Sequence, residues 1–101
     1  MAQRMNFAVI GCGMLARQTH IPNLARSTKA ALHTCCDLSE DALRVCREQY
    51  GVRQTTRDYR TAIADPAVQA ICLATTEKLR LPVIAAAAAA GKPIYVEKPL
   101  A

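Results

Sequence analysis

The glycines near the amino terminus constrain the fold of this chain more than any other feature. An apolar run, Phe7 to Ile10, leads directly into Gly11 and Gly13, and the small residue Ala16 follows. This G-x-G-x-x-A spacing is typical of the turn from a buried strand into a helix in dinucleotide-binding folds. Gly11 permits a tight turn, Gly13 lets the backbone approach a pyrophosphate, and Ala16 lets the helix pack closely on the strand. On its own, the pattern is equally compatible with a strand-to-helix turn that binds nothing.

The start of the helix after these glycines is a candidate anion site. Its unpaired backbone N–H groups and the positive end of its dipole face the group that lies in front of it. The residues that we expect to contact a cofactor at this turn are Gly11, Cys12, Gly13, Met14 and Leu15.

Composition points to one α/β domain. Of the 101 residues 51% are hydrophobic, and most are aliphatic, since the chain has one Phe, three Tyr and no Trp. This favours layers of helices on aliphatic strands over a surface that stacks nucleic-acid bases. The net charge of +5 comes from Lys and Arg residues scattered along the chain. We therefore interpret it as a solvated basic surface and expect no nucleic-acid partner.

The cysteines and the amino terminus indicate a cellular compartment. The five cysteines form no C-x-x-C pair, and most lie in apolar runs, so we expect reduced, buried thiols and no metal site. The first residues lack the apolar region of a signal peptide, and no segment reaches the length of a membrane span. We therefore expect a cytoplasmic protein without a membrane partner.

Strands and helices are predicted to alternate along the chain. Apolar runs predict strands over 5–10, 30–36, 52–56, 68–74 and 94–97, and the intervening segments predict helices over 14–27, 40–50, 59–64 and 79–90. Short connections in such an alternation imply a parallel sheet with right-handed crossovers. We expect a Rossmann-type doubly wound α/β fold of strand order 3-2-1-4-5. Residues 1–101 would form one incomplete nucleotide-binding domain that stops before its last strand.

An acidic residue after the second strand supports the glycine motif. Asp37 stands 24 residues after Gly13, where a carboxylate accepts the ribose hydroxyls of NAD and repels the 2′-phosphate of NADP. Asp37 could instead cap the next helix, but Ser39 is the better cap, and Leu38 is expected to pack on Leu43. We therefore predict that the Asp37 carboxylate is free for NAD, with NADP less favoured.

The topology predicts where the two halves of a cofactor site meet. The strand order reverses between the first and fourth strands, so Gly11 and Gly13 would lie across a crevice from Thr75 and Thr76. We predict a loop over 75–78 and place Pro82 in the first turn of the following helix, where a missing N–H is tolerated.

Three stretches carry a resemblance to a known family. They are Val9-Ile10-Gly11-Cys12-Gly13, Cys36-Asp37-Leu38 and Ala89-Ala90-Gly91-Lys92-Pro93-Ile94-Tyr95-Val96-Glu97-Lys98-Pro99-Leu100-Ala101. The chain resembles the amino-terminal domain of the Gfo/Idh/MocA (glucose-fructose oxidoreductase, inositol dehydrogenase) family, whose pattern A-G-K-x-V-x-x-E-K-P-L-A is similar to the last stretch. The Glu-Lys-Pro of that pattern is far more specific than the glycines.

The resemblance implies a nicotinamide-dependent oxidoreductase that acts on a sugar, a polyol or a similar small carbinol. It places Glu97 and Lys98 in the cofactor site, with Lys98 beside the nicotinamide and the substrate. An ammonium there can polarise a developing alkoxide or carbonyl oxygen during hydride transfer. Without the resemblance, Lys98 would be interpreted as an exposed lysine at a strand end.

Two departures from the family pattern qualify this expectation. Where family members often carry T-P-N-x-x-H, this chain has Thr75-Thr76-Glu77-Lys78-Leu79-Arg80, so that only the first threonine matches. The family also continues into a second α/β domain with the substrate pocket, which the sequence given does not contain. We therefore expect the chain to bind a dinucleotide and not to turn over alone.

Three further expectations concern function, assembly and cofactor choice. The same fold could serve as a non-catalytic dinucleotide-sensing or regulatory module, which Glu77 and Arg80 favour. An uncovered fifth strand at the sheet edge would pair with a second copy, so we expect a homo-oligomer. If the chain prefers NADP, Arg44 and Arg47 are the candidate phosphate partners.

Overall fold

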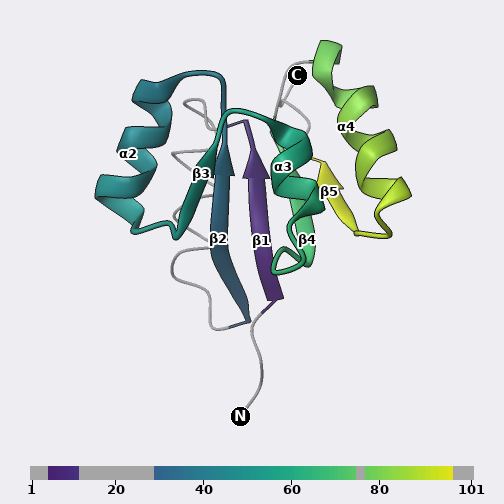
Figure 1. Ribbon diagram of the computed structural model, residues 1–101, viewed down its shortest axis with the longest axis horizontal. Coiled ribbons are helices and arrows are strands. Elements are labelled where there is room, and N and C mark those ends of the chain that lie inside the picture. Colours follow the sequence, from purple (N-terminus) through teal and green to yellow (C-terminus); the bar gives the residue numbers. More distant parts are fainter. Residues whose placement is uncertain (1–4, 12–28, 75–76, 97–101) are drawn as a thin grey trace.

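The computed structural model describes residues 5–11, 29–74 and 77–96, which Figure 1 draws in colour. In this part of the chain five parallel strands form one sheet in the order β3-β2-β1-β4-β5. The strands are β1 (Met5–Ile10), β2 (Ala30–Cys36), β3 (Gln54–Thr56), β4 (Ala70–Leu73) and β5 (Ile94–Val96). The helices are α2 (Glu40–Tyr50), α3 (Tyr59–Ala64) and α4 (Glu77–Ala89). The Rossmann-type strand order predicted from the sequence is confirmed, and the helix predicted over 14–27 lies outside the described residues.

The centre of the sheet is β1, which pairs with β2 on one side and with β4 on the other. Val9 stands opposite Cys35 of β2 and opposite Cys72 of β4. One register shift interrupts the pairing with β2 between Phe7 and Ala8. Because all strands run parallel, their carboxyl ends meet at one edge of the sheet, which is the edge where this fold binds its ligands.

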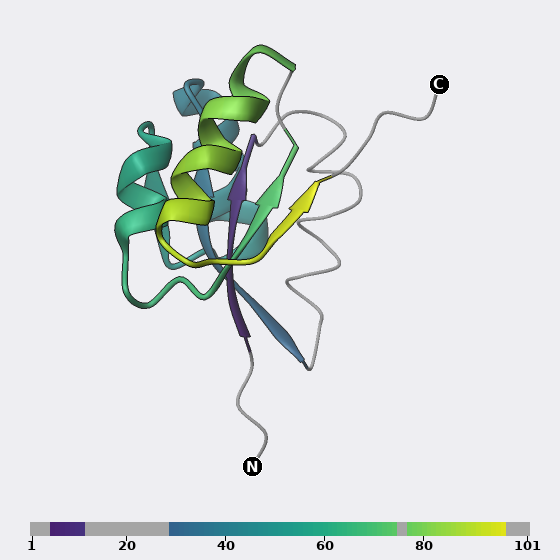
Figure 2. The same ribbon diagram turned by 90° about the vertical axis from the view of Figure 1, so that its right-hand side faces the viewer.

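Alternate residues of the central strands face two separate hydrophobic clusters. On one face Ala8, Ile10 and Ile71 pack with α3 and α4, and Figure 2 shows both helices on the same side of the sheet. On the other face Val9 and Cys72 pack with buried residues of α2. The core is therefore two apolar layers with the sheet between them, as expected for a parallel sheet covered on both sides.

The observed ends of α2 agree with those predicted from the sequence, but one predicted contact near its start is absent. The Ser39 side chain accepts a hydrogen bond from the backbone N–H of Ala42, and Gly51 ends the helix in the left-handed conformation with φ of 62°. Both signals act locally, which explains why the predicted bounds are confirmed. The predicted packing of Leu38 on Leu43 is wrong, because Leu38 is 67% exposed whereas Leu43 is buried in the core.

The start of α4 also differs from the prediction. The helix begins at Glu77, so Glu77 and Lys78 belong to it and not to a loop. Pro82 is consequently an interior residue of the helix and not a first-turn residue. The missing N–H of Pro82 costs the helix one backbone hydrogen bond. Burial of Val83 and Ala87, both 0% exposed, offsets that loss through tertiary packing.

The bounds of two strands differ slightly from the prediction, whereas the described cysteines agree with it. Of the predicted strands, β3 and β4 both begin two residues later in the structure, and β4 ends one residue earlier. Four cysteines are buried free thiols, as predicted: Cys35, Cys36, Cys46 and Cys72. None of the helices described above is long and apolar enough to cross a bilayer.

Candidate functional site

The carboxyl ends of three neighbouring strands are joined by backbone hydrogen bonds just beyond β1. The N–H of Gly11 donates to the carbonyl of Cys36 at 2.8 Å, and the N–H of Ala74 donates to the carbonyl of Ile10 at 2.9 Å. Gly11 has φ of 96°, which side-chain-bearing residues rarely adopt, so a glycine is favoured at this position. These bonds set the start of the glycine turn beside the residues that follow β2 and β4.

Asp37 lies next to this turn and is held from two sides. Its N–H donates to the carbonyl of Thr56 at 3.2 Å, and its Oδ1 accepts a hydrogen bond of 2.8 Å from the N–H of Ser39. Ser39 and not Asp37 caps α2, as predicted, but the Asp37 carboxylate has a partner that the sequence did not indicate. Local backbone geometry lets an Asp side chain bond to the N–H two residues on. This bond orients the Asp37 carboxylate relative to the start of α2.

Cys36, which accepts the hydrogen bond from Gly11 and directly precedes Asp37, has an unreactive thiol. The pKa of its thiol is raised from 9.0 to about 12, chiefly by burial and in smaller part by the negative charges of Asp37 and Asp58. A thiol with such a pKa stays protonated at neutral pH and is a poor nucleophile. Cys36 therefore serves the core and not the chemistry.

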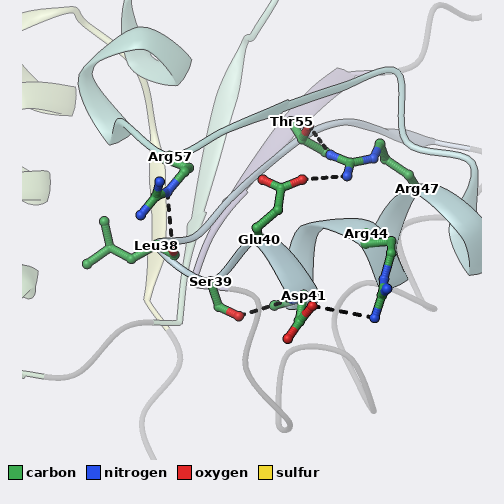
Figure 3. A network of polar contacts seen from close by, with 9 residues as sticks. Leu38, Ser39, Glu40, Asp41, Arg44, Arg47, Thr55 and Arg57 are labelled. Atoms are coloured by element: carbon green, nitrogen blue, oxygen red, sulfur yellow. Dashed lines mark hydrogen bonds and ion pairs between the residues drawn. The ribbon is translucent and has the colours of Figure 1, made fainter.

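A network of charged side chains lies along α2, which begins three residues after Asp37 (Figure 3). Arg47 donates to Glu40 at 2.6 Å and to Thr55 at 2.8 Å, and Arg44 lies 3.5 Å from Asp41. Both arginines considered as phosphate partners are therefore already engaged along α2. Such exposed ion pairs contribute little to stability.

Sequence reasoning missed one side chain at this edge. The Nε–H of Arg57 donates to the carbonyl of Leu38 at 3.1 Å, so this arginine lies against the segment that follows Asp37. Arg57 follows β3, and β3 pairs with β2 in the sheet. The strand order alone could have placed residues 37 and 57 together, because the ends of paired parallel strands are neighbours.

Most of the predicted site residues lie outside the described part of the chain: Cys12, Gly13, Met14, Leu15, Thr75, Thr76, Glu97 and Lys98. Gly11 and Asp37 are described, and the structure brings them together. In the first turns of α4, the Nε of Arg80 is buried without a hydrogen-bond partner. Within the described residues no cluster of His, Cys, Asp and Glu could hold a metal ion.

Comparison with known proteins identifies the class to which this fold and site belong. The family model described as "Oxidoreductase family, NAD-binding Rossmann fold" (GFO_IDH_MocA) matches residues 5–101. The chain belongs to this family, and it is an NAD-binding Rossmann domain. The resemblance inferred from the glycine turn, from Asp37 and from the Glu-Lys-Pro stretch is thus confirmed.

Individual relatives are dehydrogenases. The chain is 33% identical over 96 residues to myo-inositol 2-dehydrogenase of Thermotoga maritima, covering 95% of this chain and 28% of that protein. It is 33% identical over 102 residues to scyllo-inositol 2-dehydrogenase (NAD(+)) of Bacillus subtilis, covering 99% of this chain and 29% of that protein.

A crystal structure of a probable dehydrogenase from Thermotoga maritima matches the fold with a TM-score of 0.87 and 32% identity, covering 96% of this chain and 29% of that one. This chain therefore spans less than a third of the length of these relatives.

Proposed function

We propose that the chain binds NAD along the carboxyl edge of its sheet, with the pyrophosphate at the Gly11 turn and the adenosine ribose on Asp37. The observation that carries this proposal is the hydrogen bond from the N–H of Gly11 to the carbonyl of Cys36, at 2.8 Å. This bond joins the glycine turn to the residue that directly precedes Asp37. A dinucleotide needs that adjacency, because its pyrophosphate and its adenosine ribose are consecutive groups.

The remaining predicted residues extend this site in the proposal. Backbone groups of Cys12, Gly13, Met14 and Leu15 add donors at the pyrophosphate. Thr75, Thr76 and Glu97 line the nicotinamide side. Lys98 is the residue that polarises the reacting oxygen while a hydride moves between the nicotinamide and a carbinol carbon.

The substrate class of the proposed reaction is a cyclic polyol or a sugar. The named relatives that support it are inositol dehydrogenases, which the chain matches over less than a third of their length. We accordingly assign residues 1–101 to the cofactor half of the reaction and expect the substrate pocket to come from a second domain. Buried free thiols at Cys35, Cys36, Cys46 and Cys72 support a reducing compartment, the cytoplasm.

The adenosine assignment is tested by Asp37→Ala. A hydrogen bond to a charged group contributes about 1.5–3 kcal/mol, which corresponds to roughly 10- to 100-fold in affinity. Calorimetric titration should therefore show NAD binding weakened by roughly that factor. NADP binding should be unchanged or tighter, because the substitution also removes a charge that repels the 2′-phosphate.

Asp41→Ala is the matched control, since it removes the same charge from an aspartate whose side chain is 89% exposed on α2. Its NAD affinity should equal that of the unmutated chain. Tighter binding of NADP than of NAD by the unmutated chain would show that Asp37 does not hold the ribose.

A second candidate is a dinucleotide-sensing module without hydride chemistry. The observation that favours it is the unpartnered, buried Nε of Arg80, a residue that stands where relatives often carry a neutral histidine. A full-length protein that binds NAD but fails to reduce it with any polyol or sugar would support this candidate over the dehydrogenase.

A further inference from the structure

Beside Asp37 the surface offers an apolar side chain and a planar cation that the proposed function does not use. Leu38 directly follows Asp37 and is 67% exposed. The Arg57 guanidinium lies against the same segment through the bond from its Nε–H to the carbonyl of Leu38, at 3.1 Å. Figure 3 shows both side chains projecting to the same side of the connection between β2 and α2.

The hydrogen bond uses one edge of the guanidinium, the Nε–H. Arg57 itself is an exposed residue, and within the described part of the chain its side chain makes no other hydrogen bond or ion pair. By contrast, Arg44 and Arg47 are held in ion pairs with Asp41 and Glu40. Of these three arginines, Arg57 is thus the one that remains available to a ligand.

The covalent structure of the cofactor determines which group would reach this surface. The adenine is attached to the ribose carbon next to the one whose hydroxyl Asp37 would bind, so the base would lie beside the segment that carries Leu38 and contacts Arg57. Adenine is flat, aromatic and uncharged. A guanidinium stacks well on such a ring, and an exposed leucine gains by covering its apolar surface.

We propose that Arg57 is the adenine-stacking residue of this chain, and that Leu38 completes the base platform with it. This inference rests on the proposed binding of NAD at Asp37. A 2′-phosphate on Arg57 is the less favoured alternative, since the Asp37 carboxylate repels it and the exposed Leu38 offers it nothing.

The test is calorimetric titration of Arg57→Ala with NAD, ADP-ribose and NADP. Loss of stacking at an exposed site should weaken all three ligands by the same factor, about fivefold. Arg57→Lys keeps the charge but not the planar group, so it should be as weak as the alanine variant. Unfolding midpoints of both variants should match that of the unmutated chain, because Arg57 is exposed.

Arg53→Ala is the matched control, because Arg53 is also exposed but precedes β3, at the opposite edge of the sheet. It should leave all three affinities unchanged. Equal weakening by Arg53→Ala, or full affinity in Arg57→Lys, would overturn the proposal. Either result would show that the positive charge, and not stacking by a planar group, raises the affinity.

Weakening of NADP alone would overturn the proposal in favour of phosphate binding. Unchanged affinities in Arg57→Ala would overturn it while leaving NAD binding at Asp37 intact. Failure of the unmutated chain to bind NAD at all would overturn both.

Discussion

Cys36 and Asp37 are consecutive residues with opposite environments. Cys36 is 3% exposed and ends β2 inside the core, whereas Asp37 is only partly buried and begins the connection to α2. The pKa of the Cys36 thiol reflects both environments, because burial in the core raises it and the neighbouring charge of Asp37 raises it as well. At neutral pH the Cys36 thiol is therefore protonated, and the negative charge at this boundary belongs to Asp37.

Removal of the Cys36 thiol should change how stability depends on pH. The thiol titrates at 9.0 when unfolded and at about 12 when folded, so between these values the unfolded chain loses the proton first. The free energy of unfolding consequently falls as the pH rises through this window, and the contribution is complete below the unfolded value. Urea unfolding across this window should show a shallower fall in Cys36→Ala than in the unmutated chain. Equal slopes would mean that the thiol titrates alike in both states.

Helices show which local signals in a sequence can be trusted. The bounds of α2 could be predicted because Ser39 and Gly51 act within their own turn of backbone. The start of α4 could not, because sequence reasoning treated the cost of Pro82 as decisive. In the structure, packing of Val83 and Ala87 on the sheet outweighs that cost. Local chemistry predicts an element well until tertiary packing competes with it.

Lys92 joins two elements that are distant in the sequence. Its Nζ donates to the carbonyl of Asp65 at 2.7 Å and to the carbonyl of Ile63, so it satisfies acceptors at the carboxyl end of α3 from the turn before β5. Burial lowers the pKa of Lys92, while the charge of Asp65 opposes the shift.

Lys92→Met keeps most of the apolar stem and removes the ammonium. Hydrogen bonds to charged groups contribute about 1.5–3 kcal/mol, and the carbonyls left behind lose their partner, so we expect the free energy of unfolding to fall by about 2 kcal/mol. Urea denaturation measures this difference. An unfolding curve identical to that of the unmutated chain would show that water replaces the ammonium without loss.

At the scale of the whole molecule, the topology could be predicted because few arrangements satisfy an alternation of strands and helices with short connections. Gly11 and Asp37 could be predicted as parts of one candidate site, because this topology places the ends of the first and second strands next to each other. The strand order brings the ends of β2 and β3 together, but the hydrogen bond from the Arg57 side chain to Leu38 cannot be predicted from that order. The bond from the N–H of Ser39 to Asp37 was missed for the same reason, since it depends on the exact course of the backbone.

The most direct test of the account is an NMR titration of the chain with NAD, following backbone amides. The account predicts shifts at the carboxyl edge of the sheet, at Gly11, Asp37 and Arg57. It predicts no shifts at the opposite edge, for the amides that precede β2, β3 and β4: Lys29, Arg53 and Gln69. Shifts confined to that opposite edge, or unchanged Gly11 and Asp37 amides at saturating NAD, would contradict it.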